Sequence, residues 1–302
     1  MPDHSSHASG KTSDAVATAY TNVINADALA RLQKAQVPLV VLDCSFDLAD
    51  AGAGRRAYDE GHIEGAHYVH LDEHLSGTKT GTNGRHPLPD REALVQTFAS
   101  LGIDNDTQVV AYDNAAGMYA ARLWWLMRWL GHDKVAVLNG GVAEWKAQGL
   151  PLTAQASPRP ASPGAFTPNS TLTRIVDHAA LRANLETREN LVVDARAPDR
   201  FRGENETIDP VGGHIPGARN HFFRLNLTDG GLFREPQALR DAYTKLIEGF
   251  DADHVVMQCG SGVTACHNLL AMDIAGFKNV SLYPGSWSEW CKTPGAPVAT
   301  TS

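Results

Sequence analysis

The sequence of 302 residues consists of two halves that repeat one pattern at a spacing of about 150 residues. Each half contains an apolar run ending in aspartate, at 39–43 and 191–194, and then Gly-His-Ile-x-Gly-Ala, at 61–66 and 213–218. A second apolar run, a helical segment and a closing Glu-Trp pair complete each half. Buried apolar runs that alternate with helical segments predict an α/β fold with two tandem parallel sheets, each covered by helices on both faces.

The repeat divides the chain into two domains joined by a linker. We expect an N-terminal domain over residues 21–154, a linker rich in Pro, Ala and Ser over 155–168, and a C-terminal domain over 169–298. Residues 1–20 are polar at their start and are predicted to form a disordered tail. A chain of this length is too long for one ordinary hydrophobic core and suits two.

Composition and charge limit the class of protein. The formal charge of -8 argues against a general surface for nucleic acid or anionic membranes. No apolar run approaches the roughly 20 residues that span a bilayer, and no hydrophobic segment follows a basic start, so we expect no secretory signal. Four scattered cysteines without CxxC spacing argue against a zinc site or a disulfide scaffold. These features predict a soluble, cytoplasmic protein without a metal or organic cofactor.

One cysteine lies where the second domain is expected to bind ligands. Residues 255–265 read as a buried strand, then Cys259, a glycine-rich loop and the start of a helix. Ligand sites in parallel sheets lie beyond the carboxyl ends of the strands. Loop N–H groups and a helix N-terminus favour an anion there, so we expect Cys259 to react as a thiolate and to carry a negatively charged sulfur adduct. Asp113 stands at the matching position of the first half and cannot serve as a sulfur nucleophile.

From about residue 22 to residue 295, the chain resembles the two-domain rhodanese-type sulfurtransferases. The resemblance rests on the repeated Gly-His-Ile-x-Gly-Ala motif, the Glu-Trp pairs and the Cys259 loop. In that family the N-terminal domain has lost its cysteine and is inactive, while the C-terminal domain keeps it. The resemblance implies that Cys259 takes sulfur from a small anionic donor as a persulfide and passes it to thioredoxin, glutathione or cyanide.

The resemblance leaves two sulfur donors open. The loop Cys-Gly-Ser-Gly-Val-Thr is the form associated with 3-mercaptopyruvate sulfurtransferases, whereas thiosulfate-preferring members often carry basic residues where Gly260 and Ser261 stand. Mercaptopyruvate enzymes, however, usually have a second substrate arginine several residues after the first, and residues 204–210 contain none. The sequence therefore favours mercaptopyruvate, with a thiosulfate-preferring rhodanese as the alternative.

The resemblance also assigns residues to substrate binding. Arg200 is predicted to hold the carboxylate or sulfonate of the donor, a task that suits a planar guanidinium. Arg202 is a further binding candidate, with a structural ion pair as its alternative, and Arg196 is expected to be structural. The persulfide is predicted to lie in a cradle formed by the loop residues Gly260, Gly262, Val263 and Thr264.

A proton relay at Ser261 is a further implication of the resemblance. The Ser261 hydroxyl is expected to polarise or protonate the mercaptopyruvate carbonyl, helped by a histidine that reaches across the domain interface and by an upstream aspartate. His62 is the candidate histidine and Asp50 the candidate acid. The repeat offers an alternative, because His214 holds the same place in the second half and both histidines could simply fix their turns by hydrogen bonds.

Two other classes of protein compete with this interpretation. Tyrosine phosphatases also hold a cysteine among N–H groups, but they need an arginine six residues later, where this chain has Ala265. A catalytically idle module that binds partners would fit the first half, but the second half has an intact loop. Two features are assigned to the core and not to the site, namely Cys266 and the cluster Trp124, Trp125, Met127 and Trp129.

Overall fold

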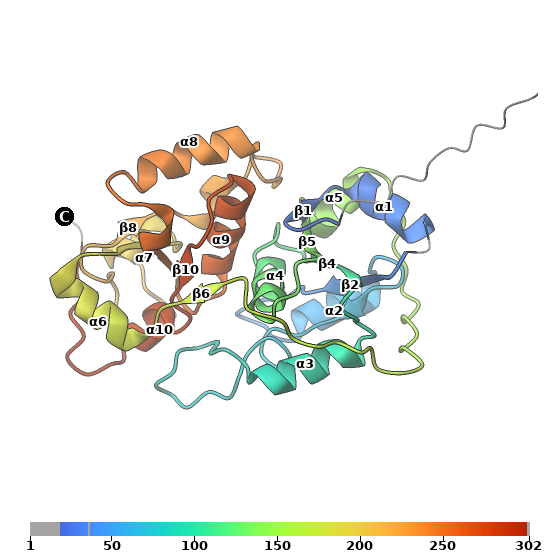
Figure 1. Ribbon diagram of the computed structural model, residues 1–302, viewed down its shortest axis with the longest axis horizontal. Coiled ribbons are helices and arrows are strands. Elements are labelled where there is room, and N and C mark those ends of the chain that lie inside the picture. Colours follow the sequence, from blue (N-terminus) through green and yellow to red (C-terminus); the bar gives the residue numbers. More distant parts are fainter. Residues whose placement is uncertain (1–18, 36, 301–302) are drawn as a thin grey trace, which may run out of the picture.

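Two five-stranded parallel sheets, each flanked by helices, form the chain (Figure 1). The structure is a computed structural model that describes residues 19–35 and 37–300, so most of the predicted tail lies outside the described residues. The strand order is β1-β5-β4-β2-β3 in the first sheet and β6-β10-β9-β7-β8 in the second. The two sheets therefore share one topology, and the predicted fold class is confirmed.

The first domain contains five strands and five helices in the described part of the chain. The strands are β1 (Val23–Ile24), β2 (Leu39–Asp43), β3 (His67–Tyr68), β4 (Gln108–Tyr112) and β5 (Val135–Leu138). The helices are α1 (Ala26–Lys34), α2 (Ala53–Glu60), α3 (Arg91–Ser100), α4 (Ala120–Trp129) and α5 (Gly141–Ala147).

The second domain repeats this order of elements. The strands are β6 (Arg174–Ile175), β7 (Leu191–Asp194), β8 (Arg219–Asn220), β9 (Val255–Gln258) and β10 (Ser281–Leu282). The helices are α6 (His178–Thr187), α7 (Pro198–Arg202), α8 (Pro236–Leu246), α9 (Thr264–Ile274) and α10 (Ser286–Trp290), with short 3-10 turns at Phe223–Asn226 and Ala252–His254.

Each central strand is apolar on both sides because helices cover both faces of its sheet. In β4, Val109 belongs to the core beneath α3 and α4, whereas its neighbour Val110 belongs to the core shared with α1, α2 and α5. In β9, Val255 packs with α8 and α9, and Val256 packs with α6 and α10. This arrangement leaves the carboxyl ends of β4 and β9 as the places where loops can form sites.

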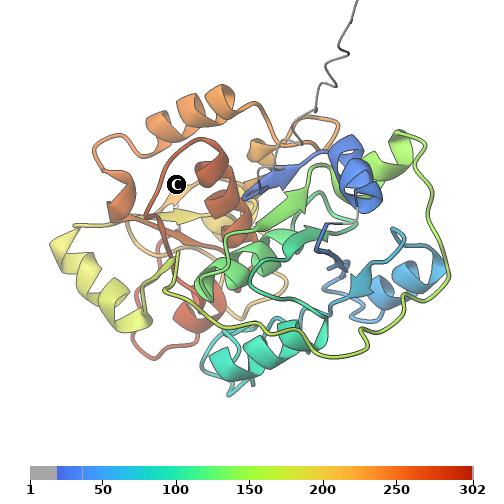
Figure 2. The same ribbon diagram turned by 45° about the vertical axis from the view of Figure 1, so that its right-hand side comes forward.

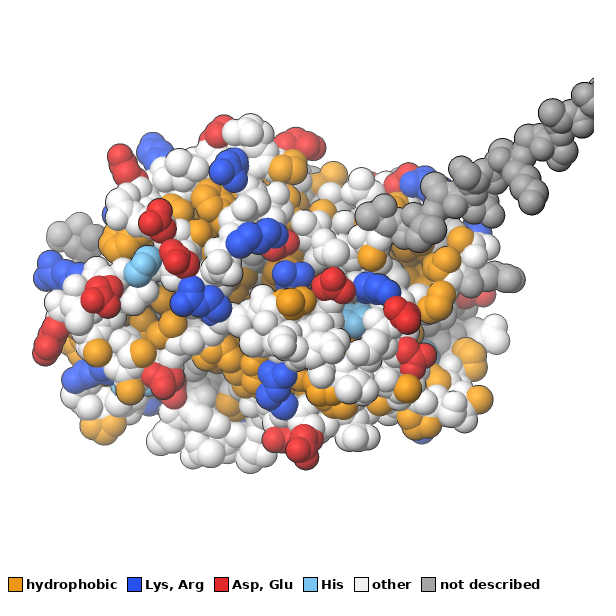
Figure 3. Space-filling model, viewed as in Figure 1, with side chains coloured by type: hydrophobic (Ala, Val, Ile, Leu, Met, Phe, Trp, Pro, Cys, Tyr) orange, Lys and Arg blue, Asp and Glu red, His pale blue; other side chains and the backbone are white. Residues whose placement is uncertain are grey.

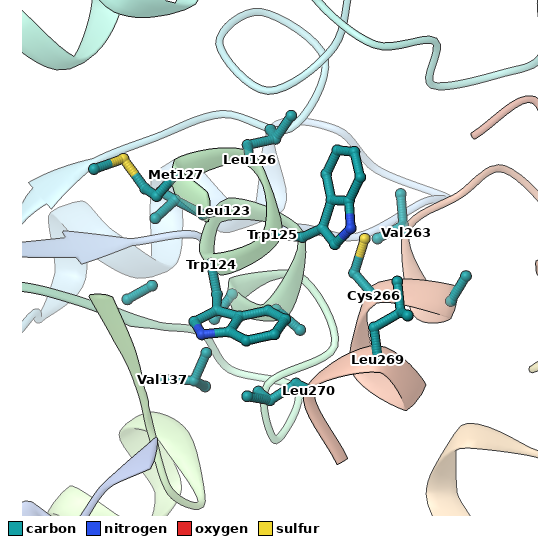
Figure 4. Packing of buried hydrophobic residues seen from close by; sticks show 14 of the residues in the cluster. Leu123, Trp124, Trp125, Leu126, Met127, Val137, Val263, Cys266, Leu269 and Leu270 are labelled. Carbon is teal, nitrogen blue, oxygen red and sulfur yellow. The ribbon is translucent and has the colours of Figure 1, made fainter. Parts of the chain in front are cut away.

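The two domains share one hydrophobic core. Helix α4 of the first domain packs against α9 of the second, and Trp125 faces Cys266 and Leu269 across that contact (Figure 4). Trp125 and Cys266 are buried, as expected from the sequence, and burial raises the pKa of the Cys266 thiol to about 12. A packed apolar interface of this kind fixes the position of one domain's loops against the other's.

The connection between the domains runs along the outside of the first domain, past α3 (Figure 2). Its backbone is held there by hydrogen bonds from Gly164 to Ala99 and from Asn169 to Leu130. The predicted linker thus packs on the domain that precedes it.

Acidic and basic side chains alternate over the face of the molecule drawn in Figure 3. Neither sign of charge gathers there into one large patch. Among the described residues we find no helix with the length and apolarity that crossing a lipid bilayer requires.

Candidate active site

Cys259 lies directly beyond the end of β9 and is only 2% exposed. Its backbone N–H donates to Ser286 Oγ at 3.1 Å, and its carbonyl accepts from the Trp287 N–H at 2.9 Å. The Ser261 N–H points at its sulfur, with 3.5 Å between N and Sγ. The loop then enters α9 at Thr264, so the positive end of that helix dipole lies close to the sulfur. This geometry stabilises a negative charge on Sγ.

The first domain shows what such a loop binds. Asp113, at the position that matches Cys259, accepts four backbone hydrogen bonds with its carboxylate, at 2.8–2.9 Å. The donors are the N–H groups of Ala115, Gly117, Tyr119 and Ala120. The carboxylate therefore fills the anion cradle of the first domain, whereas the corresponding loop of the second domain directs the Ser261 N–H at a sulfur atom.

A cavity of about 140 Å³ opens onto Cys259 between the two domains. Its apolar wall combines first-domain and second-domain side chains, namely Leu48, Leu71, Met118, Tyr119, Phe222, Phe223 and Val263. Polar groups from Arg85, His86, Arg196, Arg200, Ser261 and Thr264 also line it. The volume of the cavity suits a donor of only a few heavy atoms. Both domains are needed to form the cavity.

A chain of polar groups reaches Ser261 from the first domain. His86 Nδ1 lies 2.7 Å from Ser261 Oγ, and His86 Nε2 lies 3.5 Å from Asp72 Oδ1. Lys79 donates to the same carboxylate oxygen at 2.8 Å. With the ring proton on Nε2 facing Asp72, Nδ1 is free to accept from the Ser261 hydroxyl. Ser261, His86 and Asp72 thus form a polar relay that ends next to the Cys259 sulfur.

Burial sets the protonation state of this relay. It lowers the pKa of His86 to about 3, helped by Arg122 and Arg85 and opposed by the charge of Asp72. Burial alone would raise the pKa of Asp72, but the hydrogen bond and the charge of Lys79 oppose it, and that pKa lies below its usual value. At neutral pH the histidine is therefore neutral and the aspartate is ionised.

The prediction that His62 and Asp50 serve Ser261 is wrong. His62 Nδ1 bonds to the Tyr58 carbonyl at 2.8 Å and its ring stacks on Tyr58, with centroids 3.8 Å apart. His214 does the same with Phe201 in the second domain, at 2.9 Å and 3.8 Å. Both histidines therefore fix their turns, which is the alternative that the repeat offered. Asp50 lies on the surface in an ion pair with Arg56.

The predicted binding arginines differ in their positions. Arg200 lines the cavity, with Nε and one Nη group bonded to Glu206. Arg196 also lines it, but Asp194 holds its guanidinium at 2.6 Å, in agreement with a structural role. Arg202 does not line the cavity, contrary to the prediction that it binds the donor. Its side chain is exposed and paired with Glu204 at 2.7 Å, which is the structural alternative. Arg202 lies two positions after Arg200 on the short helix α7, so it points away from the site into which Arg200 points.

The predicted cradle residues form the turn between Cys259 and α9. Gly260, Val263 and Thr264 line the cavity. Gly262 has φ +78°, and a Cβ atom there would lie 2.4 Å from the Pro284 carbonyl oxygen, so only glycine fits.

Sequence reasoning did not identify two arginines from the first domain, Arg85 and Arg122. Arg122 on α4 is fully buried and donates to the Gly262 carbonyl at 3.1 Å and to the His86 carbonyl at 3.2 Å. It thereby ties the Cys259 loop to the loop of His86. Residues 69–90, which carry Arg85 and His86, contain no helix or strand and no motif shared by both halves, so only the fold brings them to the site.

A buried nucleophile, an anion cradle and a proton relay together support covalent transfer of a small group through Cys259. Within residues 19–35 and 37–300, no group of three or more His, Cys, Asp or Glu side chains is arranged to hold a metal ion.

Comparisons with known proteins show the family to which the chain belongs. The profile of the rhodanese-like domain family matches residues 25–148 and 177–293. The chain is 48% identical over 265 residues to a probable 3-mercaptopyruvate sulfurtransferase of Pseudomonas aeruginosa, covering 87% of this chain and 92% of that protein. It is 36% identical to the putative thiosulfate sulfurtransferase SseB of Mycobacterium tuberculosis, covering 91% and 96%.

The fold is also similar to that of solved structures. The 3-mercaptopyruvate sulfurtransferase from Leishmania major superimposes with a TM-score of 0.79 at 28% sequence identity. The match covers 91% of this chain and 76% of that one.

Proposed function

This chain belongs to the rhodanese family and is a sulfurtransferase, and from that premise we propose that its donor is 3-mercaptopyruvate and its sulfur carrier Cys259. The observation that carries the proposal is the 2.7 Å contact between Ser261 Oγ and His86 Nδ1 beside the cysteine. A sulfur donor whose leaving group must be protonated needs such a relay, and mercaptopyruvate is a donor of this kind.

In the first half-reaction, the Cys259 thiolate attacks the sulfur atom of mercaptopyruvate. An S–S bond forms, the C–S bond breaks, and its electron pair leaves on the enolate of pyruvate. Ser261 gives its proton to the enolate carbon and regains one from the S–H of the new persulfide, while neutral His86, oriented by Asp72, holds the hydroxyl. The products are pyruvate and the Cys259 persulfide anion.

In the second half-reaction, an acceptor thiolate attacks the outer sulfur of the persulfide. The S–S bond to Cys259 breaks, the acceptor leaves as a persulfide and the Cys259 thiolate returns. The Ser261 N–H and the N-terminus of α9 stabilise the thiolate at both stages. Glutathione and thioredoxin are the acceptors we propose, and cyanide is the assay acceptor that yields thiocyanate.

Thiosulfate is the second candidate donor, and the cavity arginines favour it as much as they favour mercaptopyruvate. Arg200 can bind a sulfonate or a carboxylate. Sulfite, however, leaves thiosulfate as a stable anion without taking up a proton, so a thiosulfate enzyme has no need of Ser261 and His86. The relay therefore ranks mercaptopyruvate first.

The first domain and the cellular location complete the proposal. Asp113 already fills its own cradle and carries no nucleophilic sulfur, so we assign catalysis to the second domain alone. All four cysteines are free thiols, which suits the reducing cytoplasm that we propose as the location.

The donor can be tested with the purified protein. Mercaptopyruvate without an acceptor should release one equivalent of pyruvate in a burst, and Cys259→Ser should release none. In steady state with cyanide, kcat/KM should be higher for mercaptopyruvate than for thiosulfate. A clearly higher value for thiosulfate would show that the donor assignment is wrong.

A further inference from the structure

Two guanidinium groups from different domains flank the residue next to Cys259. A Cβ atom placed on Gly260 would lie 3.0 Å from Arg85 Nη2 and 3.7 and 3.8 Å from Nη2 and Nη1 of Arg200. Both arginines line the cavity that contains the reactive sulfur. The missing side chain of Gly260 thus leaves room for both groups beside the donor.

Arg85 is held in this position by the second domain. Its backbone N–H donates to Ser288 Oγ at 2.9 Å, and its Nη1 donates to Asp209 Oδ1 at 2.6 Å. The preceding Gly84 has φ +85°, and a Cβ atom there would lie 2.8 Å from the Gly285 carbonyl oxygen. Only glycine allows this close approach, so the loop fixes Arg85 at the domain interface.

One edge of the Arg85 guanidinium carries N–H donors for which no hydrogen-bond partner is found among the described residues. Its Nε is buried without a partner among the described residues, and the hydrogen bonds found for its side chain use Nη1. A buried donor without a partner is unfavourable, which makes it a candidate for binding a ligand. The Nε and Nη2 groups together match the two oxygen atoms of a carboxylate.

We infer that Arg85 is a second donor-binding arginine, which holds the carboxylate of a 2-oxo acid together with Arg200. This inference rests on the proposed function and deepens it. Residues 204–210 of the second domain contain no arginine. The first domain supplies a second cation from the other side of the cavity, and so contributes to donor binding although Asp113 stands at the position of its cysteine.

The ion pair with Asp209 gives a rival explanation that makes different predictions. Asp209 is buried and lies 2.6 Å from Arg85 Nη1 and 3.4 Å from Arg200 Nη2. If Arg85 only holds the domains together, removing Arg85 or Asp209 should change the affinity for the donor in the same direction. If Arg85 binds the donor, removing the acidic partner should free positive charge and strengthen binding.

The test measures binding without turnover. Calorimetry on Cys259→Ser protein would give the affinity for mercaptopyruvate, and the same titration would be made with Arg85→Ala, Arg85→Lys or Asp209→Asn added. Arg85→Ala should weaken binding about 10- to 100-fold, as expected for lost hydrogen bonds to a charged group. The affinity of Arg85→Lys should lie between those of its parent and of Arg85→Ala, because lysine keeps the charge but cannot form two parallel hydrogen bonds. Asp209→Asn should bind more tightly.

Arg31→Ala is the matched control, because it removes an exposed arginine–aspartate pair of the same domain. It should leave the affinity unchanged. The inference is overturned if Arg85→Ala binds as tightly as its parent, or if Asp209→Asn weakens binding as Arg85→Ala does. Persulfide formation by the protein with Cys259 intact reports separately on the proposed function, so the two failures can be told apart.

Discussion

Replacing His86 with asparagine should separate the two sulfur donors. His86 Nδ1 lies 2.7 Å from Ser261 Oγ, and the ring is neutral because burial lowers its pKa to about 3. Proton transfer by a positioned side chain contributes about 10²- to 10⁴-fold to a rate, which corresponds to roughly 3–5 kcal/mol. We therefore expect kcat with mercaptopyruvate to fall by that factor in His86→Asn, and kcat with thiosulfate to change by less than about tenfold.

The assay follows pyruvate release with one donor and thiocyanate release with the other. His62→Asn is the matched control, since the His62 ring bonds to the Tyr58 carbonyl and stacks on Tyr58, away from Ser261, and the folded variant should keep both activities. Because the pKa of His86 is about 3, the wild-type rate should show no inflection from this residue above pH 5. An equal loss with both donors, or an equal loss in His62→Asn, would refute the relay.

Two further predictions concern the stability of the fold. Asp113→Ala removes the acceptor of four hydrogen bonds and should lower the free energy of unfolding in urea by roughly 3–6 kcal/mol; a loss below 1 kcal/mol would contradict the cradle. Burial lowers the pKa of His267 to about 4, so the unfolded chain binds a proton between pH 6.5 and 4 that the folded chain does not. The free energy of unfolding should therefore decrease as the pH is lowered from 6.5 to 4, by up to about 3 kcal/mol for this residue. The same slope in His267→Gln would contradict this.

The sequence predicted the elements that the repeat defines. The apolar runs at 39–43 and 191–194 are β2 and β7 at the bounds expected, because a parallel strand buried on both faces has an unmistakable composition. The same logic placed Cys259 and Asp113 beyond central strands. Arg200 was assigned from the family resemblance and not from the strand pattern, and it lines the cavity because α7 follows β7.

The relay was mislocated for a physical reason. A residue present in both halves, such as His62, serves what both domains need, which is a stable turn. A site that uses the two domains differently draws on residues that occur in one half only. His86 and Arg85 are of this kind, and His86 contacts Ser261 across 175 positions of sequence because the α4–α9 packing holds the two domains together. No periodicity along the chain encodes that contact.

The most direct measurement of the central claim is the mass of the peptide that contains Cys259 after treatment with mercaptopyruvate. The Cys259 sulfur, which the Ser261 N–H faces, should gain one sulfur atom, about 32 Da, and lose it again on addition of a thiol. The peptides of Cys44, Cys266 and Cys291 should not change, because burial raises the pKa of each of these thiols. An unmodified Cys259 in protein that still releases pyruvate would contradict the account.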